Sequence, residues 1–210
     1  MTAGSRVRVE VTADSRFGTN SYLVEDEETH DAVVIDSNLD PDLIIDVARR
    51  RGVNVKAILL THTDIDHIAG LHELRQAFGP IPIAVHDAER FVLADGKPLR
   101  REFAMITTRL DGVTSFDDRY MAGSLEFEVL HTPGHSPGGV TLKIDGFLFT
   151  GDALFAGSIG RSDFANSDGE ALLAGIHKEL LSQADDSIVY SGHGPATTIG
   201  RERKTNPFLS

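Results

Sequence analysis

Four side chains that can bind a metal ion follow one apolar run within a few residues. The run Val55–Leu60 is typical of a buried strand and leads directly into Thr61-His62-Thr63-Asp64-Ile65-Asp66-His67. A turn with this spacing can direct His62 and Asp64 to one side, and Asp66 and His67 to the other. That arrangement serves two metal ions at the roughly 3.5–4 Å separation of two-metal hydrolases. A helix capped by Asp66 would explain one of these residues but not four.

Two other loops hold a histidine between glycines and prolines, and a third loop holds an aspartate. His135 lies in the segment His131-Thr-Pro-Gly-His-Ser-Pro-Gly-Gly139, and His193 lies in Ser191-Gly-His-Gly-Pro195. Asp152 ends the segment Phe149-Thr-Gly-Asp. Proline restricts the backbone, so these loops can hold a ligand at a fixed angle. Because strand ends at one edge of a sheet are where α/β folds bind ligands, these side chains are expected to meet.

The periodicity of apolar residues predicts alternating strands and helices throughout the chain. Strands are expected at 7–11, 20–25, 32–36, 55–60, 81–85, 125–130, 140–144, 147–149 and 188–190. Helices are expected at 41–51, 66–78, 87–94, 169–181 and 198–204. Residues 95–112 show no clear period and are expected to form a loop or lid. This order predicts a single α/β domain over residues 1–210, built from two similar halves with sheets inside and helices outside.

Composition excludes several kinds of site and partner. The chain has no cysteine, which excludes disulfides, thiolate zinc sites and a cysteine nucleophile, so any metal must bind to His, Asp or Glu. The net charge of -12 disfavours nucleic acid as a substrate. No segment approaches the ~18 apolar residues of a membrane span. We therefore expect a cytoplasmic protein that acts on a small molecule; the sequence does not indicate its oligomeric state.

Taken together, the histidine and aspartate motifs resemble those of the metallo-β-lactamase fold superfamily over about residues 17–195. Residues 154–164 and the ending 201–209 resemble the short glyoxalase II-like (hydroxyacylglutathione hydrolase-like) enzymes. The resemblance implies an α/β (α+β) fold, a four-layer αββα sandwich, with the metal site at one edge. It also implies two divalent metal ions and a set of ligands for each. The first ion would bind to His62, residue 64 and His135, the second to Asp66, His67 and His193, and Asp152 would bridge both.

The same resemblance implies a metal-dependent hydrolase of small acyl-thioesters or esters. A hydroxide bridging the metals would be the nucleophile, Asp66 the catalytic carboxylate, and Arg161 would bind the carboxylate tail of the substrate. Imidazole and carboxylate ligands suit zinc, iron or manganese. Larger glyoxalase II enzymes hold glutathione on a C-terminal helical domain, which we expect this protein to lack. A different thiol or a lactone-like ester is therefore also expected as a possible substrate.

Asp64 departs from the family pattern, in which this position is normally histidine. As a ligand it would add a negative charge, which should reduce Lewis acidity and favour iron or manganese over zinc. Without it, His62, His135 and Asp152 form the two-histidine, one-carboxylate triad of non-haem iron oxygenases. The alternatives are thus a mononuclear iron persulfide dioxygenase and a binding protein that has lost a metal. The hydrolase-like residues 154–160 favour hydrolysis, and Asp64→His should preserve or raise activity if Asp64 is a true ligand.

Overall fold

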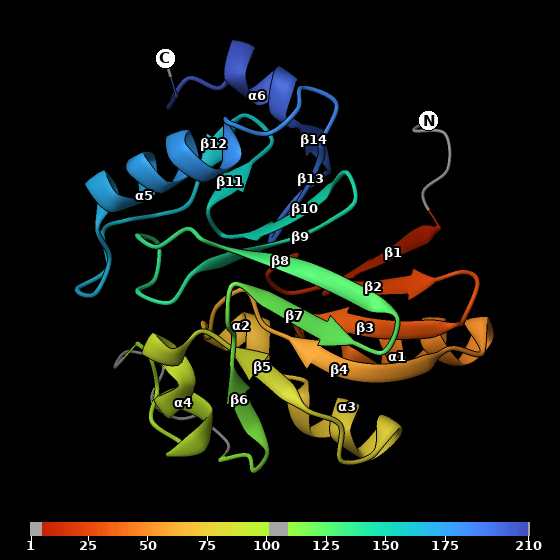
Figure 1. Ribbon diagram of the computed structural model, residues 1–210. Coiled ribbons are helices and arrows are strands. Elements are labelled where there is room, and N and C mark those ends of the chain that lie inside the picture. The colour runs from red at the N-terminus through yellow and green to blue at the C-terminus, as the bar shows by residue number, and fades with distance from the viewer. Residues whose placement is uncertain (1–5, 101–108, 210) are drawn as a thin grey trace.

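In the computed structural model, two sheets face each other in the middle of the molecule and helices cover their outer faces (Figure 1). The structure describes residues 6–100 and 109–209. The first sheet is mixed, with an antiparallel β1-β2-β3 part and a parallel β3-β4-β5-β6 part. Its strands, in spatial order, are β1 (Val7–Ala13), β2 (Asn20–Asp26), β3 (Asp31–Ile35), β4 (Asn54–Leu59), β5 (Ile83–Val85) and β6 (Val113–Ser115).

The second sheet is antiparallel except for the pair β10 and β13. A separate hairpin of β11 (Leu154–Phe155) and β12 (Ser158–Ile159) follows β10. The strands of the second sheet, in spatial order, are β14 (Thr197–Thr198), β13 (Ile188–Ser191), β10 (Phe147–Gly151), β9 (Val140–Ile144), β8 (Leu125–His131) and β7 (Arg119–Ala122).

The helices divide between the two outer faces. The first group comprises α1 (Pro41–Arg51), α2 (Ile65–Ile68), α3 (Leu71–Phe78), the single turn η1 (Asp87–Glu89) and α4 (Arg90–Ala94). The second group comprises α5 (Gly169–Gly175), its wider continuation η3 (Ile176–Leu180) and α6 (Ile199–Thr205). Figure 1 shows α3 below the first sheet, and α5 and α6 above the second sheet.

Three apolar cores separate the four layers. Alternation along β3 sends Val34 toward the helices and Val33 toward the other sheet. Along β10, Leu148 packs against the second group of helices and Phe149 packs between the sheets. The fold class expected from the sequence, an αββα sandwich, is confirmed. Among the helices in the described ranges, none combines the length and apolarity that crossing a bilayer requires.

Some elements differ from the sequence-based expectation. The helix expected at 66–78 is divided into α2 and α3 at Gly70, where a Cβ would lie 2.7 Å from the Asn38 carbonyl and 2.6 Å from Pro41 Cβ. The very short strands β11, β12 and β14 and the strands β6 and β7 were not expected. Two residues carry too little periodicity to predict a strand. Of the loop expected at 95–112, residues 95–100 and 109–112 are irregular, and 101–108 lie outside the described residues.

Candidate metal centre

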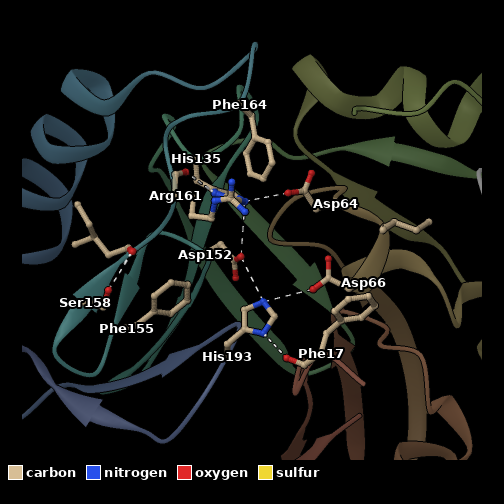
Figure 2. Close-up of a pocket in the computed structure, with 12 residues that line it drawn as sticks. Phe17, Asp64, Asp66, His135, Asp152, Phe155, Ser158, Arg161, Phe164 and His193 are labelled. Atoms are coloured by element: carbon tan, nitrogen blue, oxygen red, sulfur yellow. Dashed lines mark hydrogen bonds and ion pairs between the residues drawn. The ribbon is translucent and has the colours of Figure 1, made fainter. Parts of the chain in front are cut away.

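The loops that follow four strands bring the expected ligands to one edge of the sandwich. The loop after β4 and helix α2 contribute His62, Asp64, Asp66 and His67. The other three follow β8, β10 and β13, and Figure 2 shows them facing the α2 residues across a pocket. In the described part of the chain, two triads have ligand atoms within 4.8 Å of one another. They are His62, His135 and Asp152, and Asp66, His67 and His193.

In the first triad, both imidazoles are held through Nδ1. His62 is buried, and its Nδ1 lies 3.1 Å from the Thr61 hydroxyl. His135 Nδ1 lies 2.8 Å from the Arg161 carbonyl oxygen. A carbonyl only accepts hydrogen bonds, so this contact places the proton on Nδ1 and, in the neutral ring, leaves the Nε2 lone pair for a metal. Both histidines therefore direct Nε2 into the centre.

In the second triad, a buried carboxylate orients the central histidine. His67 is fully buried, and its Nδ1 lies 2.8 Å from Asp36 Oδ2. Asp36 adopts a positive φ of 58°, a strained conformation that is held by hydrogen bonds from the Thr61 backbone N–H and hydroxyl. The Thr19 hydroxyl donates to Asp66 Oδ2 at 2.7 Å. Carboxylate partners of this kind fix the histidine tautomer and raise its strength as a metal ligand.

Asp152 lies between the two triads. Its Oδ1 is 3.4 Å from His67 Nε2, and its Oδ2 is 3.4 Å from His193 Nε2 and 3.7 Å from His135 Nε2. Among the described side chains, His62 Nε2, His67 Nε2 and Asp152 Oδ1 are buried atoms with no hydrogen-bond partner. Leaving such atoms unsatisfied is costly, so their convergence fits a site made for cations.

Neighbouring charges of opposite sign lower the pKa of Asp66 and raise the pKa of His193. Burial alone would raise the pKa of Asp66, but the hydrogen bond to His193 and the charge of His67 hold it well below its usual range. Burial alone would lower the pKa of His193, but its contacts with Asp152 and Asp66 raise it to about 10. Without a metal, His67 and His193 therefore retain protons in ion pairs with the neighbouring carboxylates. A metal must displace those protons, so its affinity rises with pH.

Gly192 is required for this geometry. A Cβ at residue 192 would lie 2.1 Å from Asp152 Oδ1 and 2.7 Å from His67 Cε1. We expect Gly192→Ala to displace both candidate ligands and to abolish tight metal binding, measured by elemental analysis after desalting. Gly146→Ala, in the β9–β10 turn, is the matched control, since its Cβ would meet nothing within 4 Å. Normal metal content in Gly192→Ala would contradict the positions assigned to these two ligands.

Asp64 faces both a metal triad and a buried arginine. Arg100, of which 3% is exposed, donates from Nε to Asp64 Oδ1 at 2.8 Å and from Nη2 to Asp64 Oδ2 at 3.0 Å. The same Oδ2 lies 3.0 Å from His135 Nε2 and 3.9 Å from His62 Nε2. Burial would raise the pKa of Asp64, but His135, His62 and Arg100 hold it well below its usual range. The extra negative charge noted in the sequence is thus offset by a fixed positive charge.

Three residues that hold the centre together were not identified from the sequence: Asp36, Glu89 and Arg100. Glu89 is fully buried and accepts hydrogen bonds from the Thr63 N–H and hydroxyl and from the Gly138 N–H, each at 2.7 Å. It therefore ties the loop of His62 to the loop of His135. Asp36 follows an apolar strand directly, which is the same signal that identified Asp152. Arg100 has no such signal, because it lies in residues 95–112, where the apolar residues show no clear periodicity.

A cavity of about 450 Å³ opens onto both triads. Its walls are largely apolar, and Figure 2 shows aromatic rings on opposite sides of the aspartates. Arg161 lines the cavity with its side chain 68% exposed. It pairs with Asp163 at 2.9 Å and stacks on Phe164, 4.5 Å from the ring centroid. The apolar lining residues are Phe17, Ile65, Phe155, Ile159 and Phe164.

Comparisons with known proteins agree with this geometry. The family described as the Metallo-beta-lactamase superfamily matches residues 14–193. Hydroxyacylglutathione hydrolase GloC of Haemophilus influenzae is 33% identical over 220 residues, which cover 97% of this chain and 99% of that protein.

Two solved structures are similar over nearly the whole chain. The BLEG-1 B3 metallo-beta-lactamase is 36% identical with a TM-score of 0.88, covering 97% of this chain and 100% of that one. TTHA1623, in a di-iron-bound form, is 33% identical with a TM-score of 0.82, covering 95% and 100%. The resemblance inferred from the motifs is thereby confirmed: this chain belongs to the metallo-beta-lactamase superfamily.

Proposed function

We propose that this protein is a metal-dependent hydrolase of small acyl-thioesters or esters that uses two divalent metal ions. The observation that carries the proposal is the pair of triads, with Asp152 between them and buried ligand atoms that have no other partner among the described residues. The similarity to hydroxyacylglutathione hydrolase GloC of Haemophilus influenzae supports the thioester class.

The residues present fit the metals that the family implies. His62 and His135, with Asp64 beside them, would hold one ion, and Asp66, His67 and His193 the other. Asp152 would contribute to both. This mixture of imidazoles and carboxylates suits zinc, iron or manganese. When bound, the ions acidify water and polarise a substrate carbonyl.

The chain's own residues would bind and orient the substrate. The aromatic and aliphatic walls of the cavity exclude water and suit an apolar acyl or aryl group. Arg161, exposed at the cavity, would pair with a carboxylate tail in exchange for Asp163. Asp66 lines the same cavity and is our candidate for the carboxylate that takes a proton from the attacking water and returns it to the departing thiolate or alkoxide.

Chelation and reloading test the proposal. We expect a chelator to abolish hydrolysis of an acyl-thioester, an aryl ester or a lactone, and zinc, iron or manganese to restore it. A β-lactam belongs in the same panel because one of the similar structures is a B3 metallo-beta-lactamase. Full hydrolysis by the metal-free protein would contradict the proposal, and cleavage of the β-lactam alone would overturn its substrate class.

A second candidate is a mononuclear iron dioxygenase that acts on a thiol persulfide. It is favoured by the first triad, because His62, His135 and Asp152 match the two-histidine, one-carboxylate set of non-haem iron oxygenases. The assembled second triad favours hydrolysis instead. One iron per chain with oxygen uptake on a persulfide would select the dioxygenase. About two ions per chain with hydrolysis and no oxygen uptake would select the hydrolase.

A further inference from the structure

We propose that the Asp64–Arg100 pair makes the two metal sites unequal, with a tight site at Asp66, His67 and His193 and a weaker one at His62 and His135. The inference rests on the proposed function in that it requires the two ions. It concerns a feature that the hydrolase proposal does not need, a buried arginine whose guanidinium contacts one of the candidate ligands.

The contact between the two side chains is a forked salt bridge away from solvent. The side chain of Arg100 is 2% exposed and that of Asp64 is 13% exposed. Each guanidinium nitrogen in the pair donates to a different carboxylate oxygen. Paired bonds of this kind fix the orientation of both groups as well as strengthening the contact. Asp64 therefore meets any metal as a carboxylate whose charge is already neutralised.

Further contacts keep Arg100 in place. Its Nη2 also donates to the His135 carbonyl at 3.0 Å, and its Nη1 donates to the Asn166 side chain and to the Ser167 hydroxyl. The guanidinium carbon lies 4.1 Å from the centroid of the Phe164 ring. A metal arriving at the first site cannot displace a cation that is held by so many groups. It must bind beside a fixed positive charge, which weakens its affinity in a medium of low dielectric constant.

The second site lacks such a cation among the described residues and has stronger ligand support. Asp66 accepts from the Thr19 hydroxyl, a neutral group, and keeps its full negative charge for a metal. His67 is backed by the Asp36 carboxylate, whereas His62 and His135 are backed by a hydroxyl and a carbonyl. A carboxylate behind a histidine raises its basicity more than a neutral acceptor does. Both differences favour tighter binding at the second site.

Titration of the metal-free protein with zinc chloride tests the inequality. We expect calorimetry to resolve two zinc ions per chain with affinities that differ by roughly tenfold or more. After desalting from limiting zinc, we expect His62→Ala to keep one ion and His193→Ala to lose the tightly bound one. Comparing these two variants shows which site binds zinc tightly and which binds it weakly, without any measurement of hydrolysis.

Arg100→Met tests whether the arginine causes the difference. This variant keeps the length of the side chain and removes the charge, so the weaker affinity should rise roughly tenfold or more toward the tighter one. Arg119→Met, on the exposed strand β7, is the control and should leave both affinities unchanged. If Arg100→Met does not fold, Arg100→Gln, which keeps a hydrogen-bond donor, replaces it in the same titration.

The outcomes separate this inference from the hydrolase proposal. Two ions of equal affinity in the natural protein, or an unchanged difference in the Arg100 variant, would overturn the inequality and leave the two-metal hydrolase standing. A reversed order, with the tight ion lost in His62→Ala, would overturn it as well. Absence of binding in the same titration with zinc, with iron(II) and with manganese(II) would overturn both proposals together.

Discussion

Replacing Asp64 by histidine is expected to destabilise the protein by about 3 kcal/mol, although histidine is the residue that the family normally has at this position. The substitution leaves Arg100 buried without its carboxylate, and removing one partner of a buried ion pair costs roughly 3–5 kcal/mol. We place the effect at the lower end, because the His135 carbonyl and Asn166 still accept hydrogen bonds from the guanidinium. The expectation drawn from the sequence, that this substitution preserves or raises activity if Asp64 is a true ligand, stays a prediction, and the buried Arg100 adds to it an expected loss of stability.

Adding Arg100→Met to Asp64→His should restore most of the lost stability. In Asp64→His/Arg100→Met, no charge remains unpaired, and the histidine can face the first triad as a neutral ligand. Urea denaturation of the metal-free natural protein, the two single variants and the double variant gives the coupling energy between the residues. Arg161→Met is the control, because this arginine stacks on the same Phe164 ring but is exposed, so little change is expected. Additive effects of the two substitutions would show that the pair does not act as a unit.

Asp152→Ala is expected to remove both metal ions and to reduce hydrolysis by more than the roughly 100-fold that loss of an outer-shell partner can cost. Asp152 is the carboxylate that lies within 3.4–3.7 Å of histidines from both triads. Both sites should therefore fail together.

Metal content and hydrolysis measured on the same preparation check this expectation. Asp95→Asn, an exposed residue beside Lys97, is the control and should keep both ions and full activity. If Asp152→Ala retains two ions, Asp152 is not shared between the two metal sites. If the variant retains one ion, Asp152 contributes to a single site.

Much of the candidate centre could be predicted from the sequence, because its candidate ligands lie where strands end. His62 to His67, His135, Asp152 and His193 each follow an apolar run, and glycines beside them mark close approaches of the backbone. Gly151 and Gly192 illustrate this, since a Cβ at either would meet Thr61 or Asp152. The fold class follows from the same apolar runs, whose alternation assigns one face of each strand to each core.

The residues that surround the ligands could not be predicted in the same way. Arg100 contacts Asp64, which is 36 positions away in the sequence, and Asn166, which is 66 positions away. Contacts between residues so far apart produce no periodic pattern in a single sequence. Glu89 lies in a short polar turn, where an acidic residue normally faces solvent, yet it is fully buried between two loops. Such contacts depend on how the loops pack after the strands have paired, so they become visible only in three dimensions.

Crystals grown with zinc, with diffraction measured above and below its absorption edge, test the central claim most directly. We predict two anomalous peaks on either side of Asp152, one beside His62 and His135 and one beside Asp66, His67 and His193, with the first peak weaker at limiting zinc. A map without anomalous signal at either triad, in a protein whose fold is intact, would contradict the account.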